Sequence, residues 1–302
     1  GTPPGGHAGF ALESRCVKAG IQYWKIDGGD RNFNLTRFRN NAHLPLTLEH
    51  AHGEGPVNGD WKQDGRLGPQ AWDSSRVQFL RHTDVYRTYD VTSILSLPTT
   101  LDRAAEMLRS VSGHPEVRGL LNVEDEVYVA AVLGCTMGIM RHPLHGLRPA
   151  NDPDLAFAGS RNAKRRMDEV VRAIRWQRIA RPFACGIGTF QSSQEILRDG
   201  WTFKSGDTWD HDIIGATVWQ SAPAVLARNI KLPLVDAKGE KPFVFACRFP
   251  NGAVAVGAQE RTSPGKDWIM PVAEVTLGVG DSSGPFGIFG EYGRLTLSVA
   301  FR

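Results

Sequence analysis

Gln22-Tyr23-Trp24-Lys25-Ile26-Asp27-Gly28-Gly29-Asp30 is the stretch that decides the predicted fold. A helix expected over 10–19 closes on Gly20, and a strand expected over 21–26 follows directly. Polar residues at the carboxyl end of such a strand are typical of a (β/α) barrel, whose chemistry lies at that rim. Lys25 and Asp27 stand two residues apart and share one face of the strand. A cation beside a carboxylate keeps the carboxylate ionised, as a nucleophile requires.

The same arrangement of a strand with a polar end recurs along the first half of the chain. Further strands are expected over 44–50, 77–84, 118–126 and 138–142, and helices over 101–111, 127–135 and 165–178. These units predict the part of a (β/α)8 barrel that holds strands 4 to 8, within residues 1–182. Because a closed barrel has eight strands, the first three are expected on a missing N-terminal half, on the same gene or on another chain.

The chain changes character beyond residue 200, where short strands alternate with turn signals such as Pro250-Asn251-Gly252. An antiparallel β-sandwich is therefore expected over 183–302. The predicted fold class is α/β plus β, a partial barrel followed by this sandwich. Trp201, Trp209 and Trp219 are expected to fill the core of the sandwich.

Composition limits the classes of binding partner that are expected. The 302 residues carry a net charge of +3 and have no long basic tract, so nucleic acid is not expected as a partner. No apolar run has the length of a membrane span, and no membrane association is expected. The four cysteines form no CxxC pair, which disfavours zinc ribbons and redox motifs. A homo-oligomer is compatible with the sequence.

Carboxylates at the ends of neighbouring strands are what glycosidic-bond cleavage requires. One acid attacks or stabilises the sugar centre, and another protonates the leaving oxygen. Several unpaired acids at equivalent strand ends would be costly in a closed apolar core. The sequence therefore favours a glycoside as substrate, with no cofactor and no metal.

The order of these strands resembles the α-galactosidase-like clan of retaining glycoside hydrolases, families 27 and 36. Trp24-Lys25-Ile26-Asp27-Gly28 is similar to the clan's nucleophile strand, which implies Asp27 as the nucleophile and Lys25 as a sugar contact. Glu49 takes the place of an acid that contacts substrate on the next strand. The resemblance implies a barrel with a C-terminal β-sandwich and cleavage of an α-glycosidic bond.

Two stretches compete for the acid/base strand of that clan. Leu80-Arg81-His82-Thr83-Asp84 implies Asp84 as the acid/base and Arg81 as a sugar contact, and this is the preferred assignment. Tyr86-Arg87-Thr88-Tyr89-Asp90 also matches, which leaves Asp90 as the alternative and otherwise as a substrate contact. In both stretches the arginine lies one residue closer to the acid than in the family.

The last two candidate substrate contacts lie on other segments. Asn122 begins a stretch, 122–126, that is similar to the clan's Asn-Asp-Pro-Asp strand end but has no proline. Trp61, in a long loop expected over 51–75, is a candidate platform for a sugar ring.

Two other function classes stay open. His50-Ala51-His52 has a spacing that could hold a metal, as in a metal-dependent hydrolase on a barrel. A non-catalytic carbohydrate-binding protein is the other alternative. The identity of the sugar and the choice between hydrolysis and transglycosylation are not encoded in any of these motifs.

Overall fold

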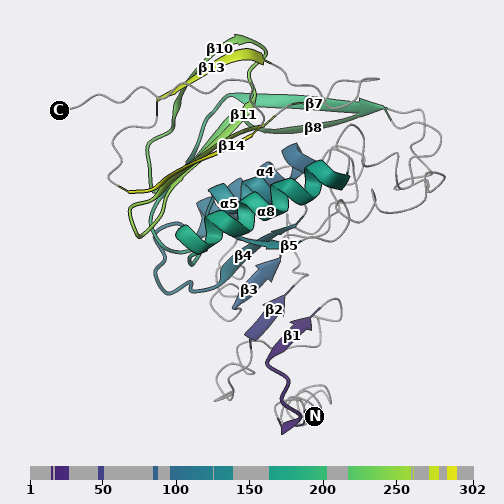
Figure 1. Ribbon diagram of the computed structural model, residues 1–302, viewed down its shortest axis with the longest axis vertical. Coiled ribbons are helices and arrows are strands. Elements are labelled where there is room, and N and C mark those ends of the chain that lie inside the picture. The colour runs from purple at the N-terminus through teal and green to yellow at the C-terminus, as the bar shows by residue number, and fades with distance from the viewer. Residues whose placement is uncertain are drawn as a thin grey trace, which may run out of the picture.

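The computed structural model shows a layered molecule in which helices lie between two sheets (Figure 1). It describes residues 15, 18–26, 47–50, 84–87, 96–124, 126–138, 163–202, 217–259, 261, 272–278 and 284–290.

The N-terminal half forms a five-stranded sheet whose order follows the sequence. Its strands are β1 (Tyr23–Ile26), β2 (Thr47–His50), β3 (Val85–Arg87), β4 (Leu120–Glu124) and β5 (Thr136–Gly138). Every neighbouring pair is parallel. Parallel neighbours in sequence order are what successive βα units produce. Closure of this sheet into a barrel remains a prediction.

Three of the expected strands contain the observed ones, one is displaced, and the strand expected over 77–84 lies outside the described residues except for Asp84. β1, β2 and β4 lie inside the ranges predicted from the sequence. β5 begins at Thr136, two residues before the predicted start, because the short helix before it already ends at Val132. β3 begins at Val85, directly after the residue at which the predicted strand was to end.

Three described helices lie over the β3–β5 end of this sheet: α4 (Ser96–Val111), α5 (Val127–Val132) and α8 (Ala163–Ile179). In α4 the buried residues recur every three or four positions, as an amphipathic helix requires, at Leu97, Leu101, Ala104 and Leu108. Gly113, with φ of 79°, follows the end of α4 in the left-handed conformation that glycine adopts freely. No described helix is long and apolar enough to cross a membrane.

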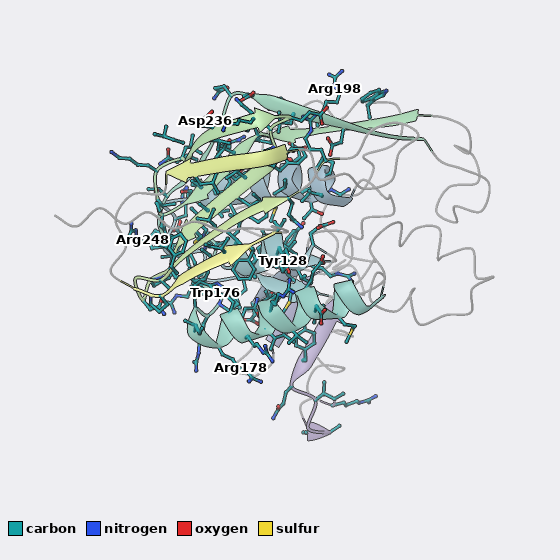
Figure 2. The ribbon with its side chains drawn as sticks, turned by 45° about the horizontal axis from the view of Figure 1, so that its top comes forward. Tyr128, Trp176, Arg178, Arg198, Asp236 and Arg248 are labelled. Atoms are coloured by element: carbon teal, nitrogen blue, oxygen red, sulfur yellow. The ribbon has the colours of Figure 1, made fainter. Side chains whose placement is uncertain are left out.

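Helix α8 has two contrasting faces. Trp176 is buried and makes edge-on ring contacts with Phe249 and Phe289, at centroid distances of 5.7 and 5.8 Å. Figure 2 shows Trp176 directed toward the strands and Arg178 directed away from them. Met167, Val171 and Ile174 form an outward stripe on α8 and are 45%, 40% and 40% exposed.

The C-terminal half contains a second five-stranded sheet, in the order β14-β12-β11-β9-β6. Its strands are β6 (Phe190–Ser192), β9 (Val225–Arg228), β11 (Phe243–Arg248), β12 (Val254–Gln259) and β14 (Phe286–Phe289). The pairs β9–β11 and β12–β14 are parallel, and β6–β9 and β11–β12 are antiparallel. The sheet is therefore mixed and not purely antiparallel, because the chain leaves it between β9 and β11 to form a strand of another sheet.

Two antiparallel strand pairs complete the described structure: β7 (Ile196–Thr202) with β8 (Thr217–Pro223), and β10 (Leu234–Gly239) with β13 (Val272–Gly278). The hairpin β7–β8 packs on α4. The ribbon β10–β13 lies at the top of the view in Figure 1, on the far side of the second sheet from the helices.

Alternation along β11 and β12 explains these layers. Phe243, Phe245 and Cys247 belong to the main core, which the helices share. Ala246 of β11 and Val254 of β12 belong instead to a smaller cluster that includes Leu277 of β13. The main core contains residues from Tyr86 to Phe289 and so draws on both sides of the predicted domain boundary at 182/183.

A buried guanidinium ties the second sheet to the turn between α5 and β5. Arg228 is 2% exposed, and its guanidinium carbon, Cζ, lies 3.6 Å from the centroid of the Phe183 ring. It donates hydrogen bonds to four backbone carbonyls, those of Leu133, Gly134, Phe183 and Ala184. Burial of a charge is tolerated here because neutral dipoles satisfy its N–H groups.

Candidate functional site

The carboxyl edge of the parallel sheet brings the predicted polar residues into register. Lys25 pairs with Glu49, and Glu49 pairs with Val85. Two residues further along the strands, Arg87 pairs with Asn122. Because the side-chain period of a strand is two, all these positions belong to the same face of the sheet. This set of positions, together with Thr136, is called the polar face below.

In β3 and β4 the opposite face is apolar. Tyr86, Leu121 and Val123 are 5%, 1% and 0% exposed and belong to the main core that the helices share. These two strands therefore bury one face against the helices. Strands of parallel sheets usually carry apolar residues on both faces, so a row of polar positions on one face is a departure from the rule. Departures of this kind mark functional sites.

Two charged residues are buried where the strands end. Arg87, the last residue of β3, is 3% exposed, and Glu126, between β4 and α5, is 1% exposed. Both interact with neighbouring groups. In the same region the Thr136 hydroxyl donates a 3.1 Å hydrogen bond to the Leu121 carbonyl. Ionised groups are costly to bury, so the side chains of Arg87 and Glu126 need polar partners at this edge.

Asp84 does not lie at this edge. The expectation that it ends a strand is wrong, because β3 begins one residue after it. The Asp84 carbonyl accepts a 2.8 Å hydrogen bond from the amide of Leu120, the first residue of β4. His50, which ends β2, pairs with Tyr86. The polar-face positions Val85 and Arg87 come one and three residues after Asp84, so Asp84 lies nearer the amino edge of the sheet than both.

Four of the sequence-predicted site residues, Asp27, Trp61, Arg81 and Asp90, lie outside the described residues. Asp27 follows the last residue of β1, and Asp90 follows Arg87 by three positions. In chain order both come after the end of a strand of the parallel sheet, whereas Asp84 comes before the beginning of one.

The described residues contain no cluster of three or more His, Cys, Asp and Glu side chains suited to a metal ion. His50 is the last residue of β2, and His52 lies outside the described part of the chain. The two-histidine motif therefore remains a prediction.

Three cysteine thiols lie in the core and are unsuited to nucleophilic catalysis. Burial raises the pKa of Cys135 and of Cys247 to about 12 and that of Cys185 to about 11, although the Arg228 guanidinium acts in the opposite direction. The nucleophilic form of cysteine is the thiolate. These three groups remain neutral thiols near neutral pH.

Sequence reasoning placed Arg87 in the less favoured of two candidate stretches, and it misplaced Trp219. Arg87 belongs to the second of the two competing stretches, and the signal for it was the tyrosine–arginine pair before Asp90. The expectation that Trp219 fills a core is wrong, since it is 54% exposed. Ser221, two residues further along β8 and on the same face, is also exposed.

Comparison with known proteins adds no relative: no family model, no curated protein and no solved structure matches the chain.

Proposed function

We propose that the chain is a retaining glycoside hydrolase that cleaves α-glycosidic bonds at the carboxyl edge of its parallel sheet. The observation that carries the proposal is the polar face, where Lys25 pairs with Glu49 across β1 and β2, and Arg87 pairs with Asn122 two residues further along β3 and β4. Cations, a carboxylate and an amide on one face of the sheet supply the hydrogen-bonding groups that sugar hydroxyls need.

Asp27 is the proposed nucleophile. It stands two residues after Lys25 and directly after β1. In the proposed reaction the Asp27 carboxylate attacks the anomeric carbon as the bond to the leaving oxygen breaks, and a covalent glycosyl ester forms. A nearby cation favours the ionised form of this carboxylate.

Asp90 is the proposed general acid/base. The preferred sequence assignment was Asp84, but Asp84 precedes β3, whereas Asp90 follows it. The carboxyl group of Asp90 donates its proton to the leaving oxygen in the first step. In the second step it removes a proton from water, which attacks the ester and releases the sugar with Asp27 restored.

The polar face also indicates what Arg87 and Asn122 contribute. Arg87 ends β3 and is buried, so its guanidinium is held in place by its surroundings. A buried, oriented cation positions substrate oxygens at little further entropic cost. Asn122, directly in register with it, adds an amide that both donates and accepts.

Completion of the sheet by further strands is part of the proposal. Among the described residues, β1 and β5 each pair with a single strand and stand at the two edges of the sheet. Open edges of parallel strands are normally paired or covered. The outward stripe of Met167, Val171 and Ile174 on α8 supports the same idea, because it offers apolar surface to a neighbouring element.

The direct test is a panel of nitrophenyl α- and β-glycosides with the complete protein. We expect release of nitrophenol from an α-glycoside, and proton NMR should show the α-anomer of the sugar first, since a retaining enzyme conserves configuration.

Asp27→Asn should reduce turnover by about a thousandfold or more while circular dichroism stays native. The activity should survive EDTA, which would inactivate a metal-dependent hydrolase. First release of the β-anomer, or native activity in Asp27→Asn, contradicts the proposal.

A further inference from the structure

The hairpin β7–β8 has one covered face and one open face. Leu197, Asp199 and Ala222 are 8%, 1% and 1% exposed. The positions that alternate with them form the open face, on which Arg198 pairs with Ser221 and Gly200 pairs with Trp219.

The covered face fixes the hairpin in place. Asp199 accepts a 2.9 Å hydrogen bond from the Arg261 guanidinium, whose Nη2 also donates to the Arg198 carbonyl at 2.7 Å. Helix α4 packs against β8 from the same side. The open face therefore belongs to a strand pair that is already held in place. The protein would lose little conformational entropy there when a ligand binds.

Trp219 is the unusual residue on the open face. Its side chain is 54% exposed, although burying an indole is strongly favourable. The opposite position is Gly200, which has no side chain, so the indole has room to lie across the strand pair. Aromatic rings often cover a glycine on the neighbouring strand, and this is a structural role for the side of the indole that faces the sheet. The exposed ring surface has no structural role in the described residues.

The described side chains beside Trp219 on this face are polar. Arg198 and Ser221 are exposed beside it, and Figure 2 shows Arg198 at the outer edge of the hairpin. Ile196 is also exposed, but it pairs with Pro223, four residues from Trp219 and about 13 Å away along the strand. Protein interfaces have contiguous apolar centres, and the side chains described on this face do not form one.

An aromatic face beside hydrogen-bonding groups is complementary to a pyranose ring. The C–H faces of a sugar are apolar, and its hydroxyls project from the rim. We propose that the open face of β7–β8 binds a glycan chain, with a sugar ring stacked on Trp219 and with Arg198 and Ser221 hydrogen-bonded to its hydroxyls. This site is separate from the polar face of the parallel sheet and does not depend on hydrolysis there.

The test is native affinity electrophoresis of the full chain carrying Asp27→Asn, in gels that contain galactomannan, xylan or dextran. We expect at least one polysaccharide to retard the protein. Trp219→Ala should weaken that binding about tenfold or more, and Trp219→Phe should keep part of it. The control is Leu234→Ala on β10, where the leucine is 79% exposed, and it should migrate as the parent does.

The outcomes separate this proposal from the catalytic one. Retardation that depends on Trp219 supports the glycan site even if the native chain hydrolyses nothing. Turnover of small nitrophenyl glycosides should be unchanged in Trp219→Ala, because the hairpin lies outside the proposed active site. The proposal is overturned if no polysaccharide retards the protein, or if Trp219→Ala is retarded as strongly as the parent. It is also overturned if light scattering shows that Trp219→Ala only converts a dimer to a monomer.

Discussion

The parallel sheet and the mixed sheet pack against the same helices, yet their other faces differ. In the mixed sheet the far face of β11 and β12 is apolar, with Ala246 and Val254 packed near Leu277 of the ribbon. In the parallel sheet the far face has Arg87 and Asn122 in register. Apolar faces on both sides give a sheet its stability, whereas a polar face gives up some stability in exchange for chemistry. The proposed active site thus lies on the sheet with the polar face, and we expect the mixed sheet to contribute more to stability.

The largest expected effect on stability comes from the mixed sheet. Phe245 is fully buried on β11, and a Cβ placed on Gly257 would come within 2.2 Å of its ring, so the ring is tightly packed and its removal leaves a cavity. Phe245→Ala should reduce the free energy of unfolding by about 3–5 kcal/mol. Urea titration followed by circular dichroism measures this.

The matched variant on the polar face is Asn122→Ala. It should cost about 1 kcal/mol or less but lower kcat/KM for the glycoside that the panel identifies. Equal destabilisation by Phe245→Ala and Asn122→Ala would remove the proposed division between the two sheets.

Arg228 tests the connection between the two regions. Arg228→Met removes the donors for four backbone carbonyls and should cost about 3 kcal/mol, because buried polar groups without partners are destabilising. Arg178→Met, at an exposed position of α8, should change stability by at most about 0.5 kcal/mol. Similar urea midpoints for the two variants would contradict the role given to Arg228.

The buried thiols predict how stability changes in alkali. Burial raises the pKa of Cys247 to about 12, from 9.0 for an accessible thiol. Above pH 9 the unfolded chain loses this proton while the folded chain keeps it, so stability falls as pH rises toward 12. In Cys247→Ala the free energy of unfolding should fall less steeply with pH, by about 1.4 kcal/mol per pH unit. Identical slopes for parent and variant between pH 9 and 11 would show that the thiol is not shielded.

The smallest effect is expected on the outward stripe of α8. Ile174 is 40% exposed and Trp176 is 5% exposed on the same helix. Ile174→Ala should cost at most about 0.5 kcal/mol in this chain, against about 3–5 kcal/mol for Trp176→Ala. If further strands and a helix complete the sheet, Ile174→Ala should become more damaging in the completed assembly than in the isolated chain. An equal cost in both would argue against a partner at α8.

Sequence reasoning succeeded where the pattern of a single element was enough. Strong periodicity predicted α4 and α8, and runs of β-branched or aromatic residues predicted β1, β4 and β11. It failed at β3, because two similar stretches six residues apart both suit a short strand and only pairing with β4 selects one of them. Trp219 was misplaced for a related reason, since local sequence does not reveal which face of a hairpin is covered.

The mixed pairing of the second sheet was also out of reach. Parallel pairing of β9 with β11 depends on the path of the chain through β10, which no local signal in β9 reports. The polar face was partly predictable, because Lys25, Glu49 and Asn122 each lie near the end of a recognisable strand. Their register was not, because it is set by contacts between strands that are far apart in the chain.

The central claim is that chemistry occurs at the carboxyl edge of the parallel sheet, and the most direct test compares two aspartates on either side of β3. Asp90→Asn and Asp84→Asn should be assayed in parallel with a nitrophenyl glycoside and with a natural, poorer leaving group. We predict that Asp90→Asn lowers turnover of the poorer substrate by about a hundredfold or more, since general acid catalysis contributes that much, while Asp84→Asn stays within a few fold of the parent. The reverse result, with Asp84 essential and Asp90 dispensable, would place the chemistry at the other edge and contradict the account.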